Sequence, residues 1–251
     1  MVFLSVASGI NIFKSMKKIL LGTLALVMIA ISGCKKEDNN DESTIGETKT
    51  CNEIDFTWND VTNPTTGKTW MERNLGASRL ATSSTDSLAY GDLYQWGRGS
   101  DGHQCRESNT TSTKSSTDTP GHGNYIITND TPDPTDDWRE PQNDNLWHGV
   151  DGINNPCPNG YRLPTKTEWE EEIESWTSEN SDGAYGSVLK LPIAGWRIHS
   201  NGSLYNVGAL GYYWSSTASG TNASRLYFNS GSAGMFTSTR AYGFSVRCIK
   251  D

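Results

Sequence analysis

The chain has 251 residues, a formal net charge of −8 and a hydrophobic fraction of 34%. It carries no block of basic residues, and this acidic balance argues against nucleic acid as a partner. Nine tryptophans and ten tyrosines accompany 25 glycines. This mixture is typical of a loop-rich fold with aromatic anchors and excludes a simple helical bundle.

The N-terminal part predicts a signal peptide followed by a lipid-attachment site. Met16-Lys17-Lys18 begins a positively charged region, and residues 19–31 form an apolar run that is too short for a stable membrane span. The run ends in Ser32-Gly33-Cys34, which resembles a lipobox. We therefore expect residues 1–33 to be the signal peptide, with Met16 as an alternative start, and Cys34 to be lipidated. An ordinary secretory signal with a chance cysteine is the alternative.

Residues 34–50 are polar and acidic, with almost no apolar side chains. Such a segment cannot bury enough surface to fold, so we expect a lipidated, flexible tether. The acidic run after Cys34 also resembles the surface-export signal of Bacteroidetes lipoproteins, although solvation alone would account for it. The sequence therefore predicts a protein held at the outer membrane by its lipid anchor, on the cell surface.

The folded domain is expected to span residues 51–251 and to open with a hairpin. Two short runs within residues 56–70 flank a turn at residues 63–67, which contains Asn, Pro and Gly. Residues 83–96 then favour a first short helix, although Tyr90-Gly91-Asp92 interrupts its period.

Residues 98–145 form a long polar loop region, which in a compact domain is usually functional or disordered. Its carboxylates are hard oxygen ligands of the kind that calcium prefers, but they lack EF-hand spacing. Structural calcium and a solvated acidic loop therefore both remain as interpretations. The candidate calcium ligands are Asp133, Asp136, Asp137 and Asp144.

A capped helix is predicted after Pro164. Thr165 occupies the N-cap position and Glu168 follows three residues later, which is the spacing of a capping box. Trp169, Ile173 and Trp176 then recur at steps of four and three and form one apolar stripe. These signals predict a short amphipathic helix that packs on the core.

The C-terminal third favours strands. Residues 189–193 alternate around Pro192 as an irregular edge strand, and Asn201-Gly202 marks a hairpin turn. Further strands are expected at residues 213–217, 225–228 and 243–249, the last with Ser245 and Arg247 facing solvent. The predicted fold class is α+β: twisted antiparallel strands with two short helices and long loops.

An ordered set of motifs resembles a known family. The motifs are WMERNLGA (70–77), YGDLYQWG (90–97), GYRLPTKTEW (160–169), LPIAGWR (191–197), YYWSST (212–217) and GFSVRC (243–248). The third is similar to a signature of formylglycine-generating enzymes, and the set resembles the Fibrobacter succinogenes major paralogous domain of Bacteroidetes-type surface lipoproteins. The resemblance implies a C-type-lectin-like fold.

Four cysteines remain after Cys34, an even number in an oxidising compartment, so we expect two disulfides. The residues alone do not choose among three connectivities. In lectin-like folds the first and last strands pair, and this implies Cys51–Cys248 and therefore Cys105–Cys157. Metal ligation is the alternative, but no pair has C-x-x-C spacing, so no metal site is assigned.

The resemblance also raises the question of catalysis. Formylglycine-generating enzymes use a pair of cysteines near the C-terminus to hold copper, but residues 225–243 contain no cysteine. Nor does the chain contain a nucleophile elbow, an H-E-x-x-H motif or a phosphate-binding glycine loop. The histidines stand in polar contexts and are expected at the surface. We therefore expect no enzymatic activity and no catalytic residues, with a related envelope enzyme as the alternative.

A binding surface is expected in the C-terminal strands, where Tyr, Ser and Asn gather as they do in antibody paratopes. The segment also resembles the variable region of diversified lectin-fold proteins. The candidate ligand-binding residues are Tyr213, Ser215, Asn222, Ser224, Tyr227 and Asn229. The leading hypothesis is a non-catalytic domain that binds a glycan or a cell-surface protein. A structural subunit of a surface assembly is the other alternative.

Overall fold

A computed structural model of the protein describes Cys51, residues 57–128 and residues 136–251. The described residues all belong to one compact unit, Thr44–Asp251. The predicted signal peptide, Cys34 and the tether lie outside the described residues, as does Asp133. Within the described ranges, no helix has the length and apolar character needed to cross a bilayer.

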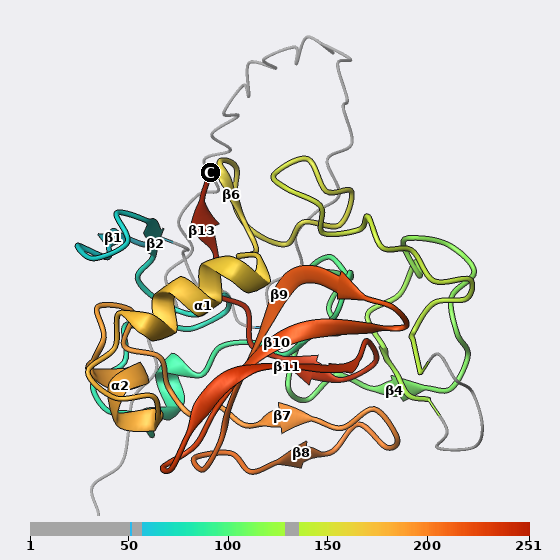
Figure 1. Ribbon diagram of the computed structural model, residues 1–251. Coiled ribbons are helices and arrows are strands. Elements are labelled where there is room, and N and C mark those ends of the chain that lie inside the picture. Colours follow the sequence, from blue (N-terminus) through green and yellow to red (C-terminus); the bar gives the residue numbers. More distant parts are fainter. Residues whose placement is uncertain (1–50, 52–56, 129–135) are drawn as a thin grey trace, which may run out of the picture. The chain divides into compact units, whose positions relative to one another are not determined.

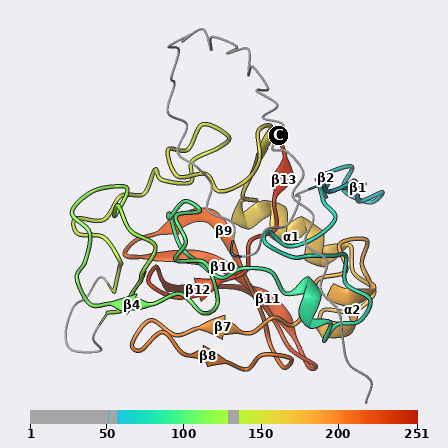
Figure 2. The same ribbon diagram turned by 180° about the vertical axis from the view of Figure 1, so that it is seen from behind.

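The described part of the chain is an α+β fold whose strands form small, mostly antiparallel sheets (Figures 1 and 2). The first sheet has the order β1 (Asp60–Thr62), β2 (Thr69–Met71), β13 (Ile249–Lys250), β6 (Tyr161–Arg162). The second has the order β11 (Ala233–Thr239), β10 (Asn222–Phe228), β9 (Gly211–Ser219). The third has the order β3 (Tyr94–Gln95), β12 (Gly243–Phe244), β7 (Trp196–Arg197), β8 (Leu204–Tyr205). A parallel pair is formed by β4 (Thr110–Thr111) and β5 (Tyr125–Ile126).

The predicted opening hairpin is confirmed as β1 and β2, which pair antiparallel. Its turn is closed by a hydrogen bond that the Gly67 amide donates to the Asn63 carbonyl at 2.8 Å. Gly67 has a φ of +71°, a left-handed conformation that glycine adopts without steric cost. The last strand, β13, then pairs with β2, so the two ends of the domain lie in one sheet.

The predicted capped helix is confirmed as α1 (Lys166–Glu174). The Glu168 amide donates to Thr165 Oγ1 at 3.2 Å, and the Thr165 amide donates to Glu168 Oε2 at 2.7 Å, which completes the capping box. Arg162 of β6 also donates to both Glu168 carboxylate oxygens, at 2.8 and 2.9 Å. The start of the helix is therefore held to the first sheet.

Helix α1 lies across one face of the second sheet (Figure 1). Its Trp169 and Ile173 are buried, and the Trp169 ring lies 5.9 Å from that of Tyr213 on β9. Leu226 and Phe228 on β10 belong to the same buried cluster. Because strand side chains alternate, the other face of this sheet presents a different set of residues.

The first short helix expected within residues 83–96 is present only as a single 3₁₀ turn, and the rest of that segment is not helical. The structure has only the short 3₁₀ helix η1 (Ser87–Ala89), and Tyr94 and Gln95 belong to β3. Gly91 has a φ of +67°, which ends helical geometry at the position that interrupts the period in the sequence. The second helix of the fold is instead α2 (Ser181–Gly186), whose Asn180 cap accepts hydrogen bonds from the amides of Asp182 and Gly183.

Two expectations about the C-terminal strands are also corrected. Residues 189–193 bury their apolar side chains but form no regular strand, and Lys190 has a φ of +45°. Ser245 and Arg247 are buried and do not face solvent. The segment between β12 and β13 runs through the interior, where Arg247 donates to Asn74 Oδ1 at 2.9 Å and to the Leu189 carbonyl at 2.7 Å.

All four cysteines of the domain form disulfides, but the expected pairing is wrong. The bonds are Cys51–Cys105 and Cys157–Cys248, with Cα–Cα distances of 5.2 and 5.9 Å. Cys248 directly precedes β13, and β13 pairs with β6, which follows shortly after Cys157. The neighbour of the last strand on that side is therefore the segment before α1, although the first and last strands do pair.

Candidate functional site

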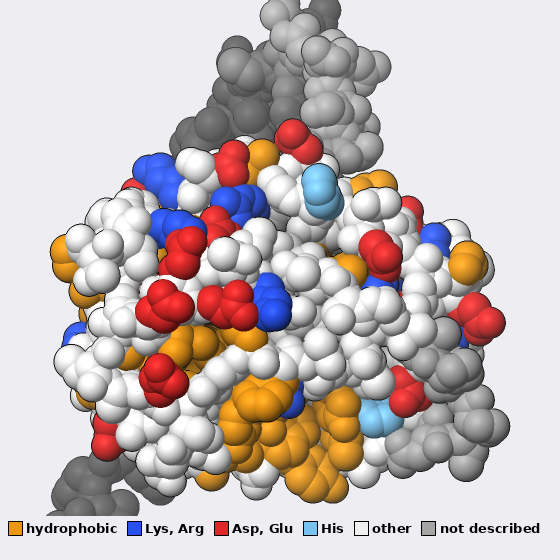
Figure 3. Space-filling model, in the orientation of Figure 1, with side chains coloured by type: hydrophobic (Ala, Val, Ile, Leu, Met, Phe, Trp, Pro, Cys, Tyr) orange, Lys and Arg blue, Asp and Glu red, His pale blue; other side chains and the backbone are white. Residues whose placement is uncertain are grey.

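Aromatic rings form a continuous row across five strands of the described structure, two from the third sheet and three from the second. Tyr205 on β8 stacks on Trp196 on β7 at 6.0 Å, and Trp196 lies 4.7 Å from Tyr212 on β9. The row continues to Tyr227 on β10 at 5.2 Å and to Phe236 on β11 at 5.8 Å. We call these residues the aromatic row. In the lower part of Figure 3, hydrophobic side chains gather over β7, β8 and β11.

Strand register explains why these rings meet. Tyr212 and Tyr227 stand directly opposite each other on β9 and β10, and Trp196 stands opposite Tyr205 on β7 and β8. Their neighbours Tyr213 and Leu226 point to the other face, toward α1. Cross-strand aromatic pairs of this kind stabilise a sheet, and here they also place the rings side by side.

The junction between the second and third sheets is filled by Phe244 of β12, which is only 2% exposed. Its ring stacks under Tyr212 at 4.9 Å and against Tyr242 at 5.5 Å. Arg197, next to Trp196, points inward and donates to the Ser108 carbonyl at 2.6 Å and to the Gly202 carbonyl at 2.7 Å. Buried contacts therefore support the row from beneath.

The two ends of the aromatic row are the most exposed. Tyr205 is 42% exposed and Phe236 is 53% exposed, whereas Trp196, Tyr212 and Tyr227 are half-buried. Contiguous exposed apolar side chains of this kind often mark a binding surface. Tyr and Trp are also residues on which binding energy concentrates.

Arg225 lies beside the middle of the row, on the same face of β10. Its guanidinium carbon is 4.5 Å from the Tyr212 ring centroid, 5.5 Å from that of Tyr227 and 5.6 Å from that of Phe236. Nε donates to Ser238 Oγ at 2.7 Å. Burial lowers the pKa of Arg225, while the neighbouring tyrosines oppose this shift. Arginine is still charged at any physiological pH.

Asn229 positions one ring of the row. Its Nδ2 donates to the Tyr227 hydroxyl at 2.6 Å. Its Oδ1 accepts hydrogen bonds from the amides of Gly231 and Ser232, each at 2.8 Å, and so also closes the turn between β10 and β11. The amide is therefore held by the turn, and it orients the phenol at the surface.

Only part of the predicted ligand-binding set lies at this face. Tyr213, Ser215 and Ser224 are buried on the opposite side of the sheet, so their assignment to a ligand-binding surface is wrong. The Tyr213 hydroxyl donates to the Pro192 carbonyl at 2.7 Å, and Ser215 Oγ donates to the Ser224 carbonyl at 2.9 Å.

The remaining predicted residues are divided between the two ends of β10. Tyr227 and Asn229 lie at the aromatic row. Asn222 is at the other end of the strand, about 20 Å from Asn229 at the usual rise per residue. The structure therefore does not bring all the predicted residues into one site.

The sequence did not lead us to Trp196, Tyr205 and Phe236 of the aromatic row, nor to Arg225 beside it. A signal for Phe236 was present, because Asn229-Ser230-Gly231 is a turn sequence that follows one strand and precedes an apolar pair at residues 235–236. For Trp196 and Arg225 the deciding information is cross-strand register, which depends on contacts distant in sequence.

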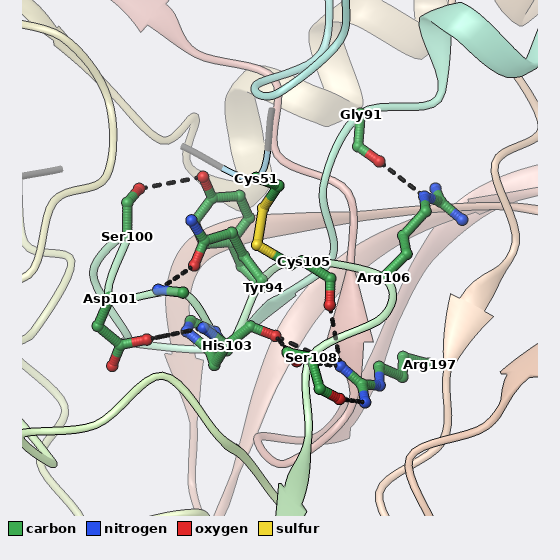
Figure 4. The surroundings of a disulfide bond; sticks show 12 residues. Cys51, Gly91, Tyr94, Ser100, Asp101, His103, Cys105, Arg106, Ser108 and Arg197 are labelled. Carbon is green, nitrogen blue, oxygen red and sulfur yellow. Dashed lines mark hydrogen bonds and ion pairs between the residues drawn. A yellow bond between two sulfur atoms is a disulfide. The ribbon is translucent and has the colours of Figure 1, made fainter. Parts of the chain in front are cut away.

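A second feature is a cavity of about 230 Å³ that is lined in part by Cys51 and Cys105, whose disulfide is drawn with its surroundings in Figure 4. Asp92 and Arg106 line it, and burial raises the pKa of Asp92 to about 7, although Arg106 opposes this shift. Arg106 donates to the Gly91 carbonyl at 2.8 Å and to the Ala194 carbonyl at 3.2 Å. The cavity therefore contains a carboxyl group that titrates near neutral pH.

Two histidines expected at the surface are buried, His103 and His199. His103 Nε2 accepts a hydrogen bond from the Gln95 amide at 3.0 Å, while its Nδ1 lies 2.6 Å from Asp101 Oδ1 (Figure 4). Burial lowers the pKa of His103 to about 4, so the ring is neutral at physiological pH. This geometry gives His103 a role in holding the loop before Cys105.

Among the described residues, no group of three or more His, Cys, Asp or Glu side chains is arranged to hold a metal ion. Asp137 and Asp144 instead form ion pairs with Arg240, and the Asp137 Oδ2–Arg240 Nη1 distance is 3.8 Å. Asp136 carries a buried carboxylate oxygen, and Asp133 lies outside the described residues. Structural calcium in this loop stays a prediction.

Comparison with protein families gives one match: the model described as "Domain of unknown function (DUF8237)" aligns with residues 171–249. The matched segment runs from within α1 to β13 and includes the whole aromatic row together with Arg225. Neither the curated proteins nor the solved structures gave a match. The match therefore covers the part of the domain that carries the aromatic row. The description of the family assigns no activity.

Proposed function

We propose that this protein is a lipid-anchored cell-envelope protein whose domain binds a ligand at the aromatic row without catalysing a reaction. The observation that carries the proposal is the row itself, which places rings from five strands side by side. Phe236 and Tyr205 reach solvent at its ends, at 53% and 42% exposure. Buried residues such as Phe244 support the rings, so the surface is already formed before a ligand arrives.

The fold we propose is C-type-lectin-like. It is supported by the α+β arrangement, by the pairing of β13 with β2, and by the capped helix α1 at the position of the family-like motif. We further propose that Cys34 carries the lipid and that the domain reaches the surface of the outer membrane. The support for this is the lipobox-like sequence and the acidic run that follows it.

The ligand that fits the face best is a glycan. A sugar ring has apolar C–H faces and polar edges, and it stacks on an aromatic side chain while its hydroxyl groups make hydrogen bonds. Asn229 and Ser238 supply polar groups near Tyr227 and Arg225. The row extends across several strands, so it suits an oligosaccharide better than a single sugar.

A protein partner is the second candidate, and one observation favours it. Val207 is 45% exposed and follows Tyr205 two residues later, so exposed apolar surface continues past that end of the row. A structural subunit of a surface assembly would dock its neighbour at this face. Co-purification of the full chain with one stoichiometric partner would support that reading over glycan binding.

The test is a binding screen of the full chain on broad glycan and protein arrays, followed by variants of the exposed rings. Tyr205→Ala with Phe236→Ala should reduce affinity for the bound ligand at least about tenfold, because truncating an aromatic anchor usually costs more than about 1 kcal/mol. Ile153→Ala is the matched control, since Ile153 is a 68% exposed apolar residue that does not belong to the aromatic row. An unchanged affinity in the double variant would refute the proposed site.

A further inference from the structure

We infer that the aromatic row selects anionic glycans, and that Arg225 is the residue that recognises their charge. This inference rests on the proposed function, and it adds the chemical class of the ligand and a specificity-determining residue. A glycan that carries a carboxylate or a sulfate group would stack on the rings and place its anionic group against the guanidinium.

Arg225 lacks a counter-charge within the described part of the chain. Of the arginines in the described residues, Arg225 alone has neither a carboxylate nor a carbonyl group as a partner. Arg79 and Arg162, for example, pair with acidic side chains. Arg197 and Arg247 are buried, and they donate to backbone carbonyls instead. Arg225 donates one hydrogen bond, from Nε to Ser238 Oγ.

The terminal guanidinium nitrogens of Arg225 have no hydrogen-bond acceptor among the described residues. Nη1 of Arg225 is buried and has no hydrogen-bond partner. A buried donor without a partner is costly, and groups of this kind in a native structure call for an explanation such as a bound ion or ligand. Within the described residues no hydrogen bond occupies Nη2 either. An incoming anion would pair with Nη2 first, and it would reach the buried Nη1 once the covering rings shift.

Four aromatic rings surround the guanidinium of Arg225. The rings of Tyr212, Tyr227, Phe236 and Phe244 lie 4.5 to 5.7 Å from the guanidinium carbon and hold it in place through cation–π contacts. A fixed planar guanidinium suits a carboxylate or sulfate, because parallel N–H groups can bind two oxygens at once. The low local dielectric beside the rings strengthens that pairing.

The net charge of the chain also bears on how an anionic ligand would bind. The protein carries a formal charge of −8, so it repels anions in general. An anionic ligand would therefore need a local positive group to bind at all. Arg225 provides this group at the middle of the surface that is proposed to hold the sugar rings.

The experiment compares two forms of one glycan. The full chain is titrated with an oligogalacturonate, whose sugar rings carry carboxylates, and with its methyl ester, in which the charge is removed. We expect the wild type to bind the acid at least about tenfold more tightly than the ester, as a charge-assisted hydrogen bond predicts. This preference should shrink as salt concentration rises, because exposed charges are screened.

The Arg225→Met variant keeps most of the side-chain volume and removes the charge. It should lose the preference for the acid, so that acid and ester bind this variant with equal affinity. Arg225→Lys should keep part of the preference, since it retains the charge without the planar fork. Thermal denaturation of both variants establishes that they are folded, so a lost preference is not confused with a lost fold.

Further probes separate the outcomes. A sulfated oligosaccharide shows which anionic group is preferred, and its binding should also depend on Arg225. Polyglutamate carries carboxylates without sugar rings. If it bound as tightly as the oligogalacturonate, the claim that the ligand must be a glycan would be overturned. Equal affinity for acid and ester, or an acid preference that survives Arg225→Met, would overturn the role of Arg225. If a neutral glycan still binds and this binding depends on Phe236, the proposed function survives without this inference.

Discussion

Removing the Cys157–Cys248 disulfide should destabilise the domain more than removing Cys51–Cys105. The two bonds are separated by 91 and 54 residues along the chain, respectively. Their loops do not overlap, so each bond can be treated on its own. The loop-entropy relation then gives about 4.6 kcal/mol for the first and about 4.2 kcal/mol for the second, which are nearly equal.

Packing separates the two bonds. Cys248 is fully buried in the core cluster that contains Met71 and Leu163, whereas Cys51 and Cys105 are half-buried. Replacing Cys248 with alanine also removes buried sulfur contacts, at a cost of about 1 kcal/mol. We therefore expect Cys157→Ala/Cys248→Ala to lose about 1–1.5 kcal/mol more than Cys51→Ala/Cys105→Ala.

The assay is equilibrium unfolding of the full chain in guanidinium chloride, with the other disulfide intact in each variant. Peptide mapping under non-reducing conditions comes first, to establish the pairing. Recovery of a peptide that joins Cys51 to Cys248 would refute the connectivity outright. If the two double variants had equal stability, or the reverse order, the argument from burial would be refuted even with the pairing intact.

Three further changes test other parts of the structure. Asp92→Asn should remove a pH dependence of stability. Burial raises the pKa of Asp92 to about 7, so the wild type loses stability as pH rises from about 4 to about 7, at up to about 1.4 kcal/mol per pH unit. Urea titrations at several pH values across this range would measure the slope in the wild type and its absence in the variant. Arg247→Met should cost about 3 kcal/mol or more, because buried oxygen atoms lose their donor. Lys166→Met should cost under about 1 kcal/mol in the same unfolding assay, because the side chains of Lys166 and its partner Glu170 are 48% and 43% exposed. Thr165→Ala should cost about 1 kcal/mol through loss of the helix cap, and a melting temperature equal to the wild type would contradict that role.

The features that sequence reasoning predicted well are local ones. The hairpin turn at Asn63–Gly67 and the capping box of Thr165 and Glu168 involve residues within a few positions of each other. Their geometry follows from the side chains present, whatever the rest of the chain does. The same holds for Asn201-Gly202, which turns β7 into β8.

The features that it missed depend on contacts between distant segments. Arg247 looks solvent-facing by alternation, yet it lies between Asn74 and Leu189, both far away in sequence. Tyr213 looks like a paratope residue by composition, but α1 covers its face of β9. In both segments the side chains do alternate between two faces. Which face is buried depends on the segments that pack against it, and these are distant in sequence.

The disulfide pairing failed for a related reason. The expectation that the first and last strands pair was sound, because β2 and β13 do pair. It did not follow that the cysteines near those strands were bonded, since Cys51 lies ahead of the hairpin and reaches the loop at Cys105. The pairing of two strands does not predict a disulfide between cysteines when one of them lies several residues outside its strand.

The positions of the disulfides also determine how the domain would respond to mechanical load. A tension that enters at Cys51 passes through sulfur to Cys105, continues along residues 106–156, and crosses at Cys157 to Cys248 before it leaves at Asp251. Helix α1, strands β9 to β11 and the whole aromatic row lie between Cys157 and Cys248. Their hydrogen bonds therefore do not bear such a load. The aromatic row keeps its shape while residues 106–156 extend.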